Sequence, residues 1–278
     1  MTSQTTRGNG LSRTAIITLT TDFGLSDHFV GTMKGVILDL APNAEIIDIS
    51  HSVQPFDILD GSLTISQAYS YFPSGTVHVV IVDPGVGSAR RPVILVGDRH
   101  YFVAPDNGVL SMVYDREERF SVRHAANDHY YLPEQSNTFH GRDIFAPLAA
   151  YLAKGIDPDR LGPEIKDFVR MGAPRPKSVD ARTLKGIVLK VDRFGNLITN
   201  ITPKDAPQLF AAKPPAFKIA IGTKTPVTRM CSNYAEGAPG EVFGILGSMG
   251  FLEVATNRGS ANQLLGAGKG SEVNVVIG

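Results

Sequence analysis

His78–Arg91, H-V-V-I-V-D-P-G-V-G-S-A-R-R, is the stretch from which the fold is inferred. It contains a continuous run of apolar, β-branched residues, 79–82, which predicts a strand buried on both faces. Asp83 follows directly, and the Pro-Gly turn after it ends the strand. A carboxylate therefore stands at the carboxyl end of a buried strand, where open α/β sheets bind ligands. We expect Asp83 and Arg90 to belong to an active site.

Strands and helices alternate on both sides of this stretch. Apolar residues at helical spacing predict helices over residues 29–40, 56–72 and 144–152. Short runs bounded by turn residues predict strands over residues 15–20, 45–50, 92–96, 101–104 and 120–124. Such alternation predicts an α/β domain with a largely parallel central sheet.

The pattern changes after residues 171–182, a proline- and glycine-containing segment that we interpret as a linker. Beyond it, closely spaced short strands with glycine turns predict a smaller antiparallel β-barrel. We therefore expect a disordered polar tail over 1–13, an N-terminal α/β domain over 14–170 and a C-terminal barrel domain over 183–278.

The composition disfavours several classes of protein. Lysine plus arginine and aspartate plus glutamate both number 27, and this zero net charge gives no bulk attraction to nucleic acid or anionic membranes. No apolar run approaches the about 18 residues of a membrane span, and residues 1–13 lack the apolar core of a signal peptide. The single cysteine, Cys231, is typical of a small buried hydrophobe. A cytoplasmic protein is expected.

Two short motifs resemble nucleotide sites only superficially. Gly85-Val86-Gly87 begins like a dinucleotide fingerprint, but Arg90 replaces the third glycine and no helix is predicted to open there. Asp22-Phe23-Gly24 spells a kinase tripeptide, but the glycine-rich and catalytic loops of kinases are missing. Neither motif supports a nicotinamide cofactor or a kinase activity.

An acid, a guanidinium and an imidazole occur in loops that border predicted elements of the sheet. Asp83 and Arg90 follow one strand, and His140 precedes a predicted helix. Together these groups can orient and activate a small nucleophile such as water. Taken singly, Asp83 can instead cap a turn, and Arg90 is more often a surface residue.

Other acids have structural roles as alternatives. Asp22 and Asp27 follow the first predicted strand, and the spacing of Asp27 favours capping of the next helix. Asp192 and Asn196 stand at the tip of a predicted hairpin, where turn formation is the favoured interpretation of the pattern alone.

Four motifs, in this order, together resemble one family. They are Thr21-Asp22-Phe23-Gly24 with Asp27, Val82-Asp83-Pro84-Gly85-Val86-Gly87, Phe139-His140-Gly141-Arg142-Asp143, and residues 192–200, D-R-F-G-N-L-I-T-N. Over residues 14–278 the sequence resembles the S-adenosyl-L-methionine hydroxide adenosyltransferases, which are relatives of the bacterial fluorinases and chlorinases. The resemblance implies a two-domain subunit and a homotrimer with active sites at the subunit interfaces.

The resemblance also implies that Asp83, Arg90 and His140 activate a water molecule that attacks the ribose C5′ of S-adenosyl-L-methionine. The halogenating enzymes carry tyrosines at the positions of Asp83 and His140, and the fluorinases have an inserted loop near Asp98, so water is favoured over halide. Substrate contacts are implied for Asp22, Asp27, Phe56, Gly141, Asp192, Phe194, Asn196, Ser248 and Met249.

Individual roles follow from the same resemblance. It implies that Asp22 binds the ribose hydroxyls and that Asp27 and Asp192 lie near the methionine ammonium. Phe56 and Phe194 are implied to pack around the nucleoside. Asn196 is implied to bind the adenine edge, and Ser248 the methionine carboxylate. Met249 stands where the fluorinases have an arginine, which leaves the full set of carboxylate ligands open. No metal or organic cofactor is implied. Two alternatives are a halogenase and a nucleoside-binding module without turnover.

Overall fold

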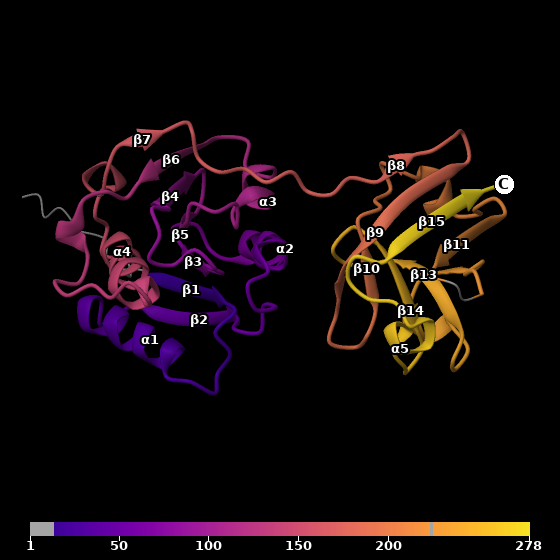
Figure 1. Ribbon diagram of the computed structural model, residues 1–278, viewed down its shortest axis with the longest axis horizontal. Helices are drawn as coiled ribbons and strands as arrows, with labels where there is room; N and C mark the ends of the chain where they lie inside the picture. The colour runs from indigo at the N-terminus through magenta and orange to yellow at the C-terminus, as the bar shows by residue number, and fades with distance from the viewer. Residues whose placement is uncertain (1–13, 223–224) are drawn as a thin grey trace, which may run out of the picture. The chain divides into compact units, whose positions relative to one another are not determined.

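The computed structural model describes residues 14–222 and 225–278, so the expected tail over 1–13 lies outside the described residues. The chain divides into two compact units, of which the first ends at Gly172 and the second begins at Ala173 (Figure 1). Each unit has its own β-sheet and its own hydrophobic core. None of the helices in the described ranges has the length and apolarity needed to span a membrane.

The N-terminal unit is built on a seven-stranded mixed sheet in the order β2-β1-β3-β5-β4-β6-β7. Its strands are β1 (Ile16–Thr21), β2 (Glu45–Ser50), β3 (Val77–Ile81), β4 (Pro92–Gly97), β5 (Tyr101–Pro105), β6 (Phe120–His124) and β7 (Glu164–Ile165). The pairings among β2, β1, β3 and β5 are parallel, whereas β4, β6 and β7 join antiparallel. The parallel arrangement expected from the sequence thus covers half of the sheet, because the short β4–β5 connection permits only a hairpin.

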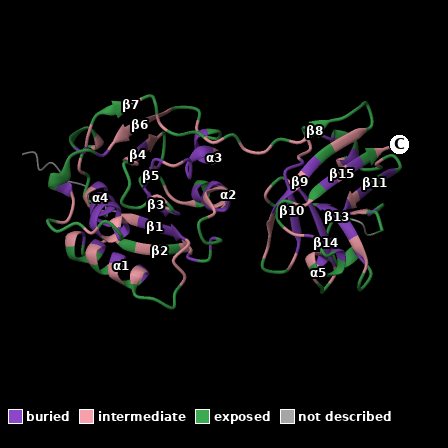
Figure 2. Cartoon of the chain, in the orientation of Figure 1, coloured by how far each residue is buried: buried purple, intermediate pink, exposed green. Residues whose placement is uncertain are grey.

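Helices cover both faces of this sheet (Figure 1). α1 (Phe29–Leu40) and α4 (Ala146–Ala153) lie on one face, and α2 (Ile58–Ala68) and α3 (Ser111–Tyr114) on the other. Strand β3 is buried along its whole length, as its apolar run predicts (Figure 2). Val79 belongs to the core that contains α1 and α4, and Val80 to the core that contains α2 and α3.

Helix α1 begins at Phe29 as predicted, but its capping residue and the starts of α2 and α4 differ from the prediction. The N-cap residue of α1 is His28, which makes no side-chain cap, so the capping role favoured for Asp27 is wrong. Helix α2 begins later than expected because the carboxylate of Asp57 accepts the N–H of Asp60 and caps it there. Phe56 therefore lies outside the helix. A π-helical turn, Gly141–Phe145, precedes α4.

The C-terminal unit contains an eight-stranded curled sheet in the order β11-β15-β9-β10-β14-β13-β12, with β8 paired to β9. Its strands are β8 (Lys177–Ser178), β9 (Thr183–Val191), β10 (Leu197–Thr199), β11 (Phe217–Ile221), β12 (Met230–Cys231), β13 (Val242–Leu246), β14 (Leu252–Thr256) and β15 (Glu272–Ile277). All pairings are antiparallel except β12 with β13. The sequence pattern does not predict α5 (Ala261–Leu265), because five residues barely exceed one helical turn.

Candidate active site

The loop after β3 is held tightly against the segment that leads to His140. Gly87 adopts a φ of +77°, and a Cβ there would collide with the carbonyl oxygen of Asn137. Only glycine tolerates both the conformation and the close approach. Ser88 Oγ donates to the carbonyl oxygen of Gly85 at 2.6 Å and closes the turn. The sequence of this loop therefore fixes the path of the chain between Asp83 and Arg90.

Asp83, Arg90 and His140 form one contiguous polar group. The Nε of Arg90 donates to Oδ1 of Asp83 at 3.0 Å, and its Nη2 lies 2.5 Å from Oδ2. The same Nη2 lies 2.8 Å from Nδ1 of His140. The side chains of Asp83 and Arg90 are only 4% and 8% exposed, and the ring of Phe145 lies 5.3 Å from the guanidinium. The structure thus brings together the three residues that the sequence grouped, with Arg90 between the other two.

Arg90 also determines where His140 carries its proton. A guanidinium can only donate, so Nδ1 of His140 accepts, and the neutral ring has its proton on Nε2. Burial lowers the pKa of His140, and the charge of Arg90 lowers it further, against opposing effects of Asp83 and Asp143. The ring is therefore neutral at neutral pH and offers an N–H from Nε2.

The turn that carries His140 is anchored in the core. Asp143 is fully buried and accepts a hydrogen bond from the backbone N–H of Ser136 at 2.8 Å. A Cβ at Gly141 would come within 3.2 Å of the sulfur of Met33 on α1. Gly141 thus permits close packing of the turn, and π-helical turns of this kind recur at functional sites.

Asp22 follows β1 and binds the backbone of Phe56, an aromatic residue with a positive φ. Its Oδ2 accepts the backbone N–H of Phe56 at 2.8 Å. Burial raises the pKa of Asp22, and the nearby charge of Asp83 adds to that rise, while the N–H of Phe56 opposes it. Phe56 has a φ of 66° and is 73% exposed. A strained backbone under an exposed ring suggests a functional rather than a packing role.

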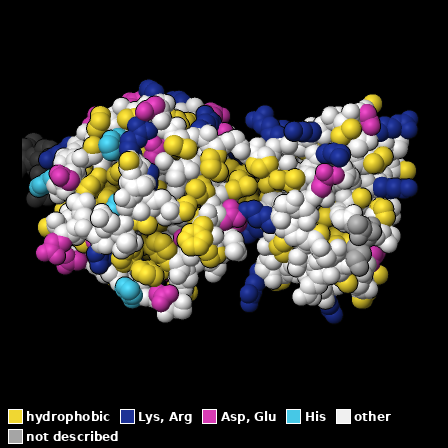
Figure 3. All heavy atoms as spheres, viewed as in Figure 1, with side chains coloured by type: hydrophobic (Ala, Val, Ile, Leu, Met, Phe, Trp, Pro, Cys, Tyr) yellow, Lys and Arg dark blue, Asp and Glu magenta, His cyan; other side chains and the backbone are white. Residues whose placement is uncertain are grey.

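The loop between β1 and α1 is exposed and partly apolar. Asp27 is exposed, and Leu25, two residues before it in the same loop, is 72% exposed. Figure 3 shows hydrophobic side chains at several places on the visible face of this unit. Asp27 is thus accessible to a ligand.

The predicted substrate residues of the C-terminal unit lie in two turns. In the β9–β10 hairpin, Oδ1 of Asp192 accepts the N–H groups of Phe194 and Asn196 at 2.9 and 2.8 Å. Its Oδ2 accepts from Asn196 Nδ2 at 2.9 Å. These bonds are the turn-forming role that the pattern alone favours, and they leave the Phe194 ring 76% exposed. Ser248 and Met249 occupy the turn after β13, where Ser248 is exposed.

A buried carboxylate on β14 was not among the predicted site residues. Glu253 is 4% exposed, packs against Gly247 and accepts a hydrogen bond from the Tyr234 hydroxyl at 2.9 Å. Burial raises its pKa, the hydrogen bond from Tyr234 opposes that rise, and the charge of Asp192 adds to it. The available signal was an acid in the middle of an apolar strand, L-E-V-A-T.

Within residues 14–222 and 225–278, no group of three or more His, Cys, Asp or Glu side chains is arranged to hold a metal ion. Cys231 is buried, and this burial raises the pKa of its thiol, which makes it a poor nucleophile. The candidate chemistry of the described residues therefore rests on the group formed by Asp83, Arg90 and His140.

The N-terminal unit has a mixed sheet with helices on both faces, and an acid, a guanidinium and an imidazole lie together beyond β3. These features define the class of protein: an α/β protein equipped for polar chemistry on a small nucleophile. The SAM hydroxide adenosyltransferase N-terminal domain matches residues 17–162, and the SAM hydroxide adenosyltransferase C-terminal domain matches residues 186–274. The chain belongs to the SAM hydroxide adenosyltransferase family, which confirms the resemblance inferred from its motifs.

Relatives match nearly the whole chain. A protein of Thermus thermophilus named (R)-S-adenosyl-L-methionine hydrolase is 38% identical over 92% of this chain and 97% of its own length. A fluorinase of Actinoplanes is 27% identical over 87% of this chain and 91% of its own. The crystal structure of an uncharacterized conserved protein from Thermotoga maritima superposes with a TM-score of 0.87 at 36% identity, covering 94% of this chain and 99% of that one.

Proposed function

We propose that this chain hydrolyses S-adenosyl-L-methionine to adenosine and L-methionine. The observation that carries the proposal is the contiguous group of Asp83, Arg90 and His140. The family resemblance places tyrosines in the halogenating enzymes where this chain has Asp83 and His140. The higher identity to a hydrolase than to a fluorinase, 38% against 27%, agrees with this choice.

The reaction replaces the C5′–S bond of the sulfonium by a C5′–O bond. Sulfur leaves with the bonding electron pair as the neutral thioether of methionine, so the leaving group needs no acid. Water supplies the oxygen and loses one proton. Asp83 accepts this proton, Arg90 fixes the carboxylate, and the Nε2–H of His140 holds the water oxygen in line with C5′. Such orientation is worth several kcal/mol.

The substrate contacts belong to the same proposal. Asp22 binds the ribose diol, Asn196 reads the adenine edge and Ser248 binds the methionine carboxylate. The exposure of Phe56 and Phe194 supports their use against the nucleoside rings. The remaining contacts are made by Asp27, Gly141, Asp192 and Met249.

Quaternary structure and environment complete the proposal. The functional subunit consists of an α/β domain over 14–170 and a β-barrel domain over 183–278, with active sites at the interfaces of a homotrimer. Family membership supports this arrangement, and a mass three times that of the subunit in light scattering would agree with it. We propose a cytoplasmic enzyme without metal or organic cofactor, whose activity survives dialysis against EDTA.

One incubation tests the activity. Purified protein is mixed with S-adenosyl-L-methionine in ¹⁸O-labelled water. The products are separated by chromatography, and their masses are measured by mass spectrometry. Adenosine labelled at the 5′ oxygen is expected, and Asp83→Ala should abolish it. Absence of adenosine above background, or equal amounts from Asp83→Ala, contradicts hydrolysis at this site. 5′-Chloroadenosine as the main product in chloride buffer would assign the chain to the halogenating enzymes, and binding without turnover would indicate a nucleoside-binding module.

A further inference from the structure

The two residues that follow the apolar part of β5, Asp106 and Asn107, each bind the chain next to a candidate catalytic group. We propose that they form a positioning pair that holds Asp83 and Arg90 in the correct position relative to each other. This inference rests on the proposed hydrolysis. Neither residue belongs to the group that would touch water or substrate. Their contacts lie at the two ends of the loop between β3 and β4.

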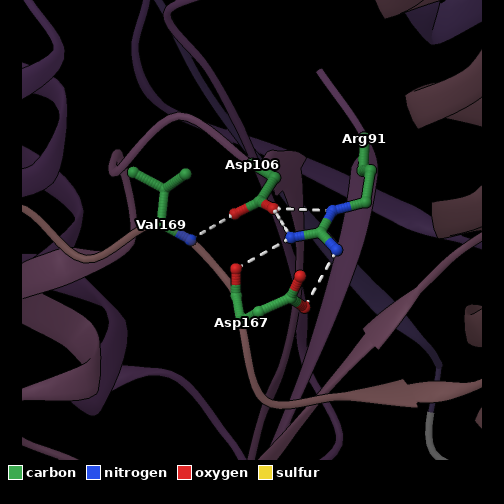
Figure 4. Close-up of polar contacts among 4 residues, drawn as sticks. All are labelled: Arg91, Asp106, Asp167 and Val169. Atoms are coloured by element: carbon green, nitrogen blue, oxygen red, sulfur yellow. Dashed lines mark hydrogen bonds and ion pairs between the residues drawn. The ribbon is translucent and has the colours of Figure 1, made fainter. Parts of the chain in front are cut away.

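Asp106 holds Arg91, the residue after Arg90 (Figure 4). Its Oδ2 accepts from Nε and Nη2 of Arg91 at 3.0 and 2.6 Å, and its Oδ1 accepts the N–H of Val169 at 2.7 Å. The backbone N–H of Asp106 donates to the carbonyl oxygen of Arg91 at 2.8 Å. Arg91 is therefore fixed through both its backbone and its side chain. The position of the Arg90 Cα is restrained with it, because a planar peptide unit joins the two residues.

Asn107 holds the residue before Asp83. Its Nδ2 donates to the carbonyl oxygen of Val82 at 2.8 Å, and its Oδ1 accepts the N–H of Val109 at 3.1 Å. Strand β3 ends at Ile81, so the carbonyl of Val82 lies beyond the ladder and needs another donor. The amide of Asn107 meets that need and fixes the peptide unit that leads into Asp83.

The strand ladders end before they reach the candidate group. The β3–β5 register stops at Val79 with Val103, and the β4–β5 register stops at Pro92 with Pro105. Among the described contacts, the positioning pair continues this support on both sides of the loop. A shift of about 1 Å at either end would separate Arg90 from its partners, and misplacement of that size can cost about 100-fold in rate.

The test compares two variants with one control from the same network. Asp106→Asn removes the charge that holds Arg91, and Asn107→Ala removes the donor to Val82 without leaving a buried charge unpaired. Asp167→Asn is the control, because Asp167 binds the same guanidinium at 3.0 Å but its side chain is 78% exposed. Both positioning variants should lower kcat roughly 10- to 100-fold with KM changed less than about threefold, and the control should keep wild-type kcat.

A second readout separates positioning from a general loss of structure and does not need turnover. Arg90 lowers the pKa of His140, so a displaced guanidinium should let that pKa rise toward its ordinary value. We expect this rise in an NMR titration of ¹³C-labelled histidine for Asp106→Asn and not for Asp167→Asn. Wild-type kcat together with an unchanged His140 titration in both positioning variants overturns the inference. A wild-type protein without adenosine production would instead overturn the proposed function, while the titration still decides the positioning.

Discussion

Replacing Asp83 by asparagine, alone and then together with Arg90→Met, should separate the stability of the N-terminal unit from its chemistry. The substitution keeps the size of the side chain and removes the negative charge that Arg90 faces through two contacts, at 3.0 and 2.5 Å. Because the guanidinium side chain is only 8% exposed, water does not replace the lost partner. The single variant should therefore lose stability as well as activity.

The magnitude follows from the burial of the pair. Breaking a buried ion pair by removing one partner costs about 3–5 kcal/mol. For a unit of this size about 1 kcal/mol shifts Tm by roughly 2–4 °C, so Asp83→Asn should lower Tm by about 6–20 °C. Adding Arg90→Met removes the stranded charge and places an apolar chain against the ring of Phe145. The double variant should recover most of the lost stability, because buried ion pairs exchange for apolar residues at little net cost.

Differential scanning calorimetry suits the measurement, since the chain contains no tryptophan. Asp115→Asn is the control, because it breaks a half-exposed pair with Arg170 whose loss should cost less than about 1 kcal/mol. Adenosine formation should vanish in both Asp83 variants and remain in the control. A double variant as unstable as Asp83→Asn, or a single variant with an unchanged Tm, would refute the view that the pair is a buried, mutually dependent unit.

Three further outcomes are expected. Burial, followed by the charge of His100, lowers the pKa of His78 to about 3. As pH falls below about 6.5, only the unfolded state takes up this proton, so the free energy of unfolding decreases as pH falls. His78→Gln should therefore reduce the slope of the unfolding free energy between about pH 6 and 4 by roughly 1.4 kcal/mol per unit, as measured by urea denaturation. Gly87→Ala should lower kcat at least about tenfold through the collision with Asn137, whereas Gly75→Ala, with a φ of +86° and open space around it, should keep activity; equal losses would contradict this. Phe56→Asn should keep or raise Tm, since asparagine tolerates this backbone at lower cost by about 1 kcal/mol, yet raise KM; an unchanged KM would remove Phe56 from the substrate site.

Much of the fold could be predicted locally. The buried run 79–82 identifies β3, and the helical spacing over 29–40 identifies α1, because both patterns depend on neighbours along the chain. The mixed character of the sheet could not be predicted in this way. Strand direction depends on which strands pair. A short hairpin joins β4 to β5, and β4 pairs antiparallel with β5 on one edge and with β6 on the other.

The sequence by itself determined that an acid follows a buried strand at Asp83 and that an arginine and a histidine accompany it in a recognisable set of motifs. Only the tertiary structure decided that Arg90 lies between Asp83 and His140, that His140 accepts through Nδ1, and that Asp106 and Asn107 brace the loop. The reason is physical. Hydrogen bonds between residues 50 positions apart depend on distances and directions that arise only when the sheet assembles, and no local preference of the chain encodes them.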